Sequence, residues 1–241
     1  MTDRLAALVV GGSGAIGRAL CQALVEEDGV SAVYAVTRSP VTVPEGVQRL
    51  DCDEQEDNVA AVCDALLEKG PFGRVIVATG MLHNQQFKGL PEKRLESLTA
   101  DGLQASFLVN TVLPALWLKH SLALMEDAPA AAFVALSARV GSISDNRLGG
   151  WYSYRASKAA LNMVLKTAQV EMQRRAPHVA LLAYHPGTVD SPLSAPFQRN
   201  VAPHKLFEPE FTARQLLSII PTLKAQEGPF FVDWQGKPIP W

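Results

Sequence analysis

Tyr154 and Lys158 are the side chains whose types and spacing first suggest chemistry. They stand four positions apart in a stretch that reads as a helix, so both lie on the same helix face. A free phenol has a pKa of about 10 and exchanges protons poorly at neutral pH, but a nearby cation favours the phenolate. Lowering that pKa to about 7 requires about 4 kcal/mol of differential stabilisation. The pair is a candidate acid–base centre, although chance alone also produces this spacing.

A glycine-rich turn, GGSGAIG at residues 11–17, is the second candidate. It closes an apolar run and opens an amphipathic stretch, which is the strand-to-helix context that a GxGxxG dinucleotide motif requires. The predicted cofactor contacts in this turn are Gly12, Ser13, Gly14, Ile16 and Gly17. The first glycine is expected to permit the tight turn, the second to let the backbone approach a pyrophosphate, and the third to let the helix pack closely. The alternative is a glycine-rich turn that binds no ligand.

The residues after the second apolar run bear on which dinucleotide would bind. Enzymes that use NAD usually carry an acidic residue here for the ribose 2′-hydroxyl. This chain has no carboxylate in Val36-Thr37-Arg38-Ser39, and Arg38 could pair with a 2′-phosphate. NADP(H) is therefore favoured, with NAD(H) as the open alternative and a solvated loop arginine as the reading without function.

Short apolar runs that alternate with longer amphipathic stretches must position these residues. The expected strands are 5–10, 32–37, 47–51, 74–78, 131–137, 179–184 and 229–233, and the expected helices are 16–27, 58–69, 98–125, 152–175 and 211–223. Because the strands are apolar throughout, they fit a parallel sheet that is buried on both faces. The sequence predicts an α/β fold of the Rossmann type: one domain, residues 1–241, with a doubly wound parallel sheet of about seven strands and helices on both faces.

Two segments depart from this simple alternation. Pro114 is expected to kink the long helix 98–125, whose apolar residues Leu108, Val112, Leu116 and Leu118 are expected mainly in the core. Residues 188–210 contain four prolines and no clean periodicity. A long segment of this kind is often functional, and we predict that it is a lid over a substrate.

Composition excludes several other classes of protein. The formal net charge of −2 gives no basic excess that would favour nucleic acid or an anionic membrane. No apolar run reaches the ~20 residues of a membrane span. The three cysteines have no CxxC spacing and the five histidines show no metal-ligand pattern, so neither a disulfide framework nor a metal site is expected. Reduced thiols favour a cytoplasmic location.

Taken together, these segments resemble the short-chain dehydrogenase/reductase family, and residues 137–163 and 232–241 resemble its C-factor-like subgroup. The resemblance rests on GGSGAIG, Asn110 in the long helix, YRASK at 154–158, and HPGTVDS at 185–191. It implies that Tyr154 is the general acid/base, that Lys158 binds the nicotinamide ribose and tunes Tyr154, and that Asn110 positions a relay water. The further contacts that it implies are Asp51 with adenine and Pro186, Gly187 and Thr188 with the nicotinamide amide. It also implies homodimers or homotetramers built on the two long helices.

The chain departs from the family pattern in three places. The glycine turn is GGxGxxG instead of TGxxxGxG, and the Asn-Asn-Ala-Gly after the fourth strand is Val77-Ala78-Thr79-Gly80. Thr79 and Gly80 are therefore either ligand-facing or only a tight turn. The third departure concerns the substrate-orienting serine, whose position holds Ala138. Ser137 is the preferred replacement and Ser142 the other, with a purely structural hydroxyl as the alternative for both.

Two functions follow from these residues. The preferred one is an NADP(H)-dependent oxidoreductase that reduces a carbonyl, or oxidises an alcohol, of a small molecule by hydride transfer, with Tyr154 as proton donor. The alternative is a dinucleotide-binding signalling or redox-sensing protein with little turnover. The missing serine favours the alternative, and the intact Tyr154, Lys158 and Asn110 favour the enzyme.

Overall fold

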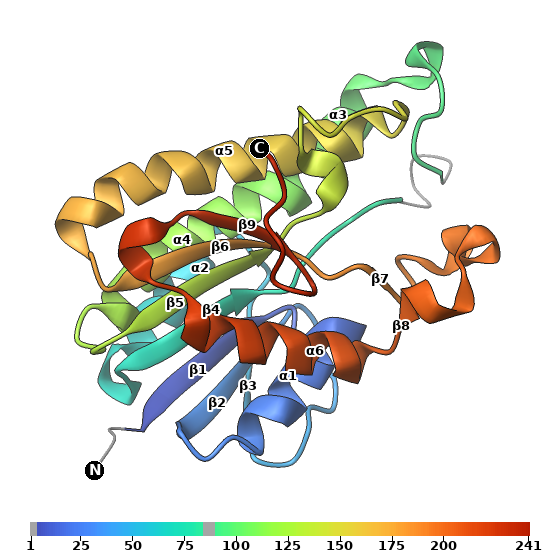
Figure 1. The fold of residues 1–241 in the computed structure, drawn as a ribbon. Helices are drawn as coiled ribbons and strands as arrows, with labels where there is room; N and C mark the ends of the chain where they lie inside the picture. The colour runs from blue at the N-terminus through green and yellow to red at the C-terminus, as the bar shows by residue number, and fades with distance from the viewer. Residues whose placement is uncertain (1–3, 84–89) are drawn as a thin grey trace.

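A seven-stranded parallel sheet forms the centre of the molecule (Figure 1). The computed structural model describes residues 4–83 and 90–241. The strand order is β3-β2-β1-β4-β5-β6-β9. The strands are β1 (Leu5–Val10), β2 (Val30–Thr37), β3 (Val47–Asp51), β4 (Phe72–Val77), β5 (Ala131–Leu136), β6 (Val179–His185) and β9 (Phe230–Asp233). The predicted number of strands and the doubly wound parallel arrangement are confirmed.

Helices cover both faces of this sheet, as its apolar strands require (Figure 1). They are α1 (Ala15–Val25), α2 (Glu56–Leu66), α3 (Ala100–Phe107), α4 (Leu113–Met125), α5 (Tyr152–Arg175) and α6 (Pro209–Ile219). Alternate residues of one strand enter different apolar layers: Leu8 and Val10 pack in the layer with Trp117, and Val9 packs in the layer with Leu216. Helices α2, α4 and α5 cover the first layer, and α1 and α6 cover the second.

The strand order places a crevice where ligands bind in open α/β sheets. Strand β1 lies between β2 and β4, so the chain builds the sheet outward in both directions from β1. At such a topological switch point the loops beyond the carboxyl ends of the strands separate and leave room for a ligand. The glycine turn follows β1 directly, and Thr79 and Gly80 follow β4 at the same edge.

The expected helix 98–125 is not regular. Helices α3 and α4 are joined by a π-helical turn, Leu108–Val112, and Pro114 lies in the first turn of α4. Proline has no amide hydrogen and its ring crowds the carbonyl four residues earlier, so the helix widens before Pro114. The prediction that Leu108 and Val112 lie in the core is wrong, because they are 52% and 42% exposed. Leu118 is buried as expected.

The helical run Ala100–Met125 is long and apolar enough, by length and composition, to cross a bilayer. No apolar run long enough to span a membrane was expected from the sequence. Half of its most apolar window is buried inside the fold, where α4 packs against β4 and α2. Burial of this kind is usual for the core helix of a globular protein, so the finding is weak evidence for a membrane span.

The segment 188–210 contains more regular structure than its sequence suggested. Strands β7 (Thr188–Val189) and β8 (Leu206–Phe207) pair with each other, and short 3-10 turns at 195–200 and 203–205 lie between them. The segment stands beyond the carboxyl ends of the sheet strands, on the same side as the start of α5 (orange in Figure 1). It leaves the sheet at β6 and returns directly into α6.

Candidate active site

The glycine turn packs so closely against its neighbours that Gly12 and Gly17 leave no room for a side chain. Gly11 has a left-handed backbone, with φ at +81°. Gly12 is required for a different reason, since a Cβ there would lie 2.8 Å from the Ala35 Cβ. A Cβ on Gly17 would lie 2.1 Å from the Gly11 carbonyl oxygen, so α1 packs directly against the turn. Gly14 is the N-cap of α1 and has no side chain to cap it, which leaves the first amides of the helix available to an anion.

Thr79 completes the cradle on the β4 side. Its Cγ2 would lie 3.0 Å from a Cβ on Gly11, so the two turns are in contact. The Thr79 Oγ1 is buried and has no hydrogen-bond partner among the residues that the structure describes. A buried hydroxyl without a partner is costly unless a ligand or water completes it. A glycine-rich turn beside this unpartnered hydroxyl fits a dinucleotide diphosphate.

Arg38 and Asp51 lie at the same corner of the sheet, because the last residue of β2, Thr37, pairs in register with Asp51. The Arg38 side chain is 75% exposed, and its Nε lies 3.7 Å from Glu54 Oε2. Asp51 is exposed and pairs with Arg49 at 3.1 Å.

Glu54 is a residue that was not singled out from the sequence. Its backbone is left-handed, with φ at 65°, and its side chain is only 9% exposed. Burial raises the pKa of Glu54, and the nearby Arg38 opposes that shift. No sequence signal marks Glu54, because its left-handed backbone becomes visible only in the structure.

Tyr154 and Lys158 lie on one face of α5, as predicted. The Lys158 ammonium donates to the Leu136 carbonyl oxygen at 2.7 Å and lies 5.9 Å from the centroid of the Tyr154 ring. Lys158 is 2% exposed, and burial lowers its pKa to about 7. Burial also raises the pKa of Tyr154.

The expectation that Lys158 lowers the pKa of Tyr154 therefore does not hold in the ligand-free chain. Burial is the cause of both shifts, because desolvation disfavours the charged form of each group. Tyr154 and Lys158 are in place, but lowering the pKa of Tyr154 requires a further positive charge in the cleft. A bound oxidised nicotinamide is a group that would bring such a charge.

Asn110 connects three parts of the site. Its side chain donates to the Met81 carbonyl oxygen and accepts from the Met81 amide, both at 2.8 Å, and it donates to Ser157 Oγ at 3.1 Å. A Cβ on Gly80 would lie 3.7 Å from Asn110 Oδ1 and 3.8 Å from Lys158 Nζ. The structure thus brings together the loop after β4, the π-helical turn and α5. Because Pro114 has no amide hydrogen, the Asn110 carbonyl lacks the donor that a regular helix would give it.

Neither candidate serine replaces the hydroxyl missing at Ala138. Ser137 is buried, and its hydroxyl donates to Asn162 Oδ1 at 2.7 Å. Ser142 is also buried, and its Oγ accepts from the Asp145 amide at 3.1 Å. The preference for Ser137 as the substrate-orienting residue loses its geometric support, because its hydroxyl already donates to Asn162 on α5. Ser137 serves the packing of β5 on α5.

The turn Pro186-Gly187-Thr188 rests on a cluster of aromatic rings that sequence reasoning missed. Gly187 has φ at +78°, and a Cβ there would lie 2.6 Å from Phe207 and 3.2 Å from Trp234. Phe207 and Trp234 have ring centroids 4.5 Å apart, and Phe211 packs against both. The base of segment 188–210 is therefore fixed beside this turn.

The middle of segment 188–210 reaches the catalytic helix. Leu193 Cδ1 would lie 3.9 Å from a Cβ on Gly80. The Phe197 ring lies 5.2 Å from that of Trp151 and 6.1 Å from that of His83. His83 Nε2 also lies 3.3 Å from the Pro192 carbonyl oxygen. These contacts place apolar side chains of the segment beside Gly80 and the start of α5.

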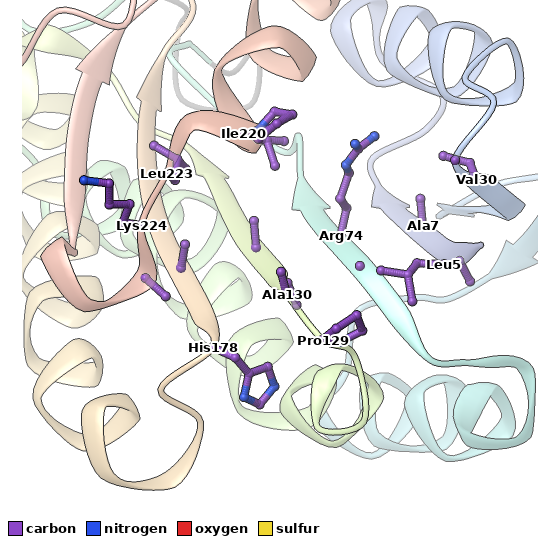
Figure 2. A pocket seen from close by; sticks show the side chains of 18 of the residues that line it. Leu5, Ala7, Val30, Arg74, Pro129, Ala130, His178, Ile220, Leu223 and Lys224 are labelled. Atoms are coloured by element: carbon purple, nitrogen blue, oxygen red, sulfur yellow. The ribbon is translucent and has the colours of Figure 1, made fainter. Parts of the chain in front are cut away.

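Cavities at the two edges of the sheet differ in relevance. A cavity of about 410 Å³ lies at the amino ends of the strands and is lined by none of the candidate active-site residues. Its lining includes Leu5, Arg74, Pro129, His178 and Lys224 (Figure 2). Its Arg74 is already paired with both carboxylate oxygens of Glu27, each at 2.5 Å. A smaller cavity of about 100 Å³ is bordered by Tyr154, Met81 and His83 and belongs to the candidate site.

Comparison with known proteins decides the family. The family model of short chain dehydrogenases matches residues 5–202. The chain belongs to the short-chain dehydrogenase family. It is 30% identical over 240 residues to 1-hydroxy-2-glutathionyl-2-methyl-3-butene dehydrogenase of Rhodococcus sp. (strain AD45), covering 97% of this chain and 98% of that one. The family resemblance seen in the sequence is confirmed.

Two further relatives support the subgroup and the fold. C-signal of Myxococcus xanthus is 33% identical over 106 residues, covering 44% of this chain and 58% of its own length. The crystal structure of an NADPH-bound carbonyl reductase from chicken fatty liver superposes with a TM-score of 0.83 at 20% identity, covering all of both chains. The likeness to C-signal confirms the resemblance to the C-factor-like subgroup. Family membership makes this short-chain dehydrogenase an oxidoreductase of alcohol and carbonyl groups that uses a nicotinamide dinucleotide.

Proposed function

We propose that this short-chain dehydrogenase is an NADP(H)-dependent carbonyl reductase, which also runs as an alcohol dehydrogenase in reverse. The observation that carries the proposal is the convergence of Tyr154, Lys158 and Asn110 near Gly80, at the switch point above the glycine turn. Hydride transfer is the chemistry that a bound nicotinamide supplies. In the overall reaction the carbonyl carbon gains one hydride from the dinucleotide and its oxygen gains one proton from solvent through Tyr154; alcohol oxidation returns both.

The residues of the chain divide the remaining work. The Tyr154 hydroxyl donates its proton to the developing alkoxide, and the raised pKa of the phenol keeps that proton in place until charge develops on the substrate oxygen. Lys158, fixed by the Leu136 carbonyl, stands beside the phenol and the expected position of the nicotinamide ribose. Asn110 fixes Met81 and Ser157 around them and positions a relay water. Ala138 supplies no hydroxyl, so Tyr154 is the main donor to the substrate oxygen.

Cofactor contacts follow the same corner of the sheet. We propose that the diphosphate lies on Gly12, Ser13, Gly14, Ile16 and Gly17, that Thr79 and Gly80 face the ligand, that Asp51 contacts the adenine, and that Pro186, Gly187 and Thr188 hold the nicotinamide amide. The exposed Arg38 is the proposed partner of a 2′-phosphate, and the structure of the chicken carbonyl reductase contains NADPH.

Cofactor preference is tested by measuring the affinity of the chain for NADPH and NADH. The chain is expected to bind NADPH more tightly, and Arg38→Asp is expected to reverse the preference. Glu54→Gln is the matched variant: it removes the carboxylate that competes for Arg38, so NADPH affinity should rise by about fivefold with little change for NADH. A clear preference of the unaltered chain for NADH would overturn the NADP(H) assignment.

Reaction type is tested by a screen of NADPH oxidation with aldehydes, ketones and quinones. Tyr154→Phe removes the donated proton while keeping the ring, and is expected to lower kcat by at least 100-fold. NADPH affinity should be unchanged, which shows that the variant is folded. Turnover that survives this substitution would remove the proposed mechanism, and NADPH binding without turnover of any carbonyl would remove the enzyme assignment.

The setting of the enzyme is also proposed. Residues 1–241 act as one dinucleotide-binding and catalytic unit, and residues 188–210 form a lid that excludes water from the substrate. The contacts of Leu193 and Phe197 with the site support the lid. A cytoplasmic homodimer or homotetramer is the proposed working form, and its three buried cysteines stay reduced.

A further inference from the structure

We propose that Trp151 and Phe197 form an aromatic clasp that selects planar, aryl-substituted carbonyl substrates. The inference rests on the proposed function, because it names the substrate class of the same site. The clasp is the pair of rings beside Tyr154: the Trp151 centroid lies 5.2 Å from that of Phe197 and 6.3 Å from that of Tyr154. The rings come from two segments that are distant in the sequence, the start of α5 and the middle of 188–210.

Trp151 is held in a backbone conformation that tryptophan rarely adopts. Its φ is 54°, in the left-handed region, and it follows two glycines, Gly149 and Gly150, that also have positive φ. A bulky residue in this region is strained, and such strain persists where surrounding structure fixes it and often where function uses it. A glycine or asparagine would adopt this backbone conformation with less strain. The presence of tryptophan here therefore points to a use for its indole ring.

Glu92 is the residue that fixes Trp151. Its carbonyl oxygen accepts from the Trp151 amide at 2.5 Å, and its carboxylate accepts from both the amide and the hydroxyl of Ser153. A carboxylate at the start of α5 also suits the positive end of the helix dipole. The loop after β4 thereby positions the indole and the first turn of the helix that carries Tyr154.

The other side of the clasp is apolar. Phe197 and Leu193 come from segment 188–210 and are half-buried against Trp151 and Gly80 respectively. His83 is the polar member, with its ring tilted against Phe197 at 6.1 Å and its Nε2 near the Pro192 carbonyl. The clasp therefore joins the loop after β4, segment 188–210 and α5.

This lining favours one class of substrate. Aromatic rings prefer tilted or offset contacts with other aromatic rings at centroid separations of 4.5–7 Å, beyond what burial of apolar area gives. Trp151 and Phe197 already touch each other, so a planar aryl group beside the carbonyl packs against the outer faces and edges of the two rings while its carbonyl oxygen lies at Tyr154. A saturated ring of similar size has no π face, so it gains only the burial of area.

The test compares two aldehydes of the same skeleton, benzaldehyde and cyclohexanecarbaldehyde, with the NADPH-loaded enzyme. Since the two differ in intrinsic reactivity, the measured quantity is the change in their kcat/KM ratio between a variant and the unaltered enzyme. Trp151→Leu and Phe197→Leu are each expected to lower the aryl preference by about five- to tenfold. Trp151→Phe keeps a ring and should lower it by less than threefold. Leu148→Ala is the control, because Leu148 is 92% exposed and outside the clasp.

The outcomes separate this inference from the proposed function. An unchanged ratio in both leucine variants, with turnover retained, overturns the clasp and leaves the carbonyl reductase intact. Absence of turnover with both aldehydes counts against the proposed function. In that case the affinities of benzyl alcohol and cyclohexylmethanol for the NADP-loaded chain are compared by equilibrium dialysis. A preference for benzyl alcohol that is lost in Trp151→Leu supports the clasp, and equal affinities overturn it.

Discussion

At the scale of single residues, burial decides the charge of the site before any ligand binds. Lys158 has a lowered pKa and Tyr154 a raised one, and desolvation is the main cause of both shifts. Both groups are therefore driven toward their neutral forms, which costs less than burying two charges.

Lys158 should make the stability of the ligand-free protein depend on pH. Its pKa is about 7 in the fold and about 10.4 when unfolded, so between these values the unfolded chain binds more protons. The free energy of unfolding should therefore rise from pH 7 to pH 8.5, by up to about 1.4 kcal/mol per pH unit. Urea unfolding at pH 7.0, 7.5, 8.0 and 8.5 measures this slope, and Lys158→Met should flatten it.

The measurement of the Lys158 contribution ends at pH 8.5 because the buried thiols affect stability above that pH. Burial raises the pKa of the Cys21 and Cys63 thiols to about 12, so above about pH 8.5 the unfolded chain loses thiol protons that the fold keeps. This effect lowers stability as pH rises and opposes the lysine contribution. A slope that is the same in the unaltered protein and in Lys158→Met, between pH 7 and 8.5, would show that Lys158 stays charged in the fold.

At the scale of elements, the π-helical turn 108–112 sets the position of Asn110. Pro114→Ala restores an amide hydrogen and lets the run from α3 to α4 become a regular helix, which rotates Asn110 away from Met81 and Ser157. Displacements of about 1 Å at a catalytic group can cost as much as 100-fold in rate. We expect kcat to fall by about tenfold or more while the thermal midpoint is unchanged or higher.

The control for this prediction is Pro129→Ala, at an exposed turn next to β5 and far from Asn110. Steady-state kinetics and thermal unfolding of the two variants separate a positioning effect from general destabilisation. Retention of full kcat in Pro114→Ala would mean that the π-helical turn is dispensable for the reaction.

At the scale of the whole molecule, the outer surface of the long helices predicts self-association. Met163 and Val170 are seven residues apart on α5 and are 60% and 58% exposed, and Leu108 and Val112 are exposed on the helical run that packs against α5. Exposed apolar side chains that share helix faces are typical of an interface between subunits. We expect a dimer or tetramer in solution.

Size-exclusion chromatography with light scattering measures this directly. Met163→Lys buries a charge in the expected interface and should shift the protein toward a 26 kDa monomer, whereas Ile143→Lys, at an exposed loop position, should not. A 26 kDa species for the unaltered chain at micromolar concentration would contradict the prediction.

The sequence by itself determined the framework of this protein. The bounds of β1, β3 and α5 were predicted to the residue, and the other strands of the central sheet to within two, because runs of apolar residues and helical periodicity are local properties. The short strands β7 and β8 were not predicted. The glycine turn and the Tyr154–Lys158 spacing were equally legible, since each lies within a few residues of chain.

Tertiary structure alone decided how the site is completed. Glu92 fixes Trp151, Phe207 packs on Gly187, and Asn162 accepts a hydrogen bond from the Ser137 hydroxyl, each across 20 or more residues of chain. No local pattern encodes such contacts, because they arise only when strands and helices pack. The same holds for the pKa of Lys158 and Tyr154: the sequence placed them together, but only the packed interior sets how much water each one loses.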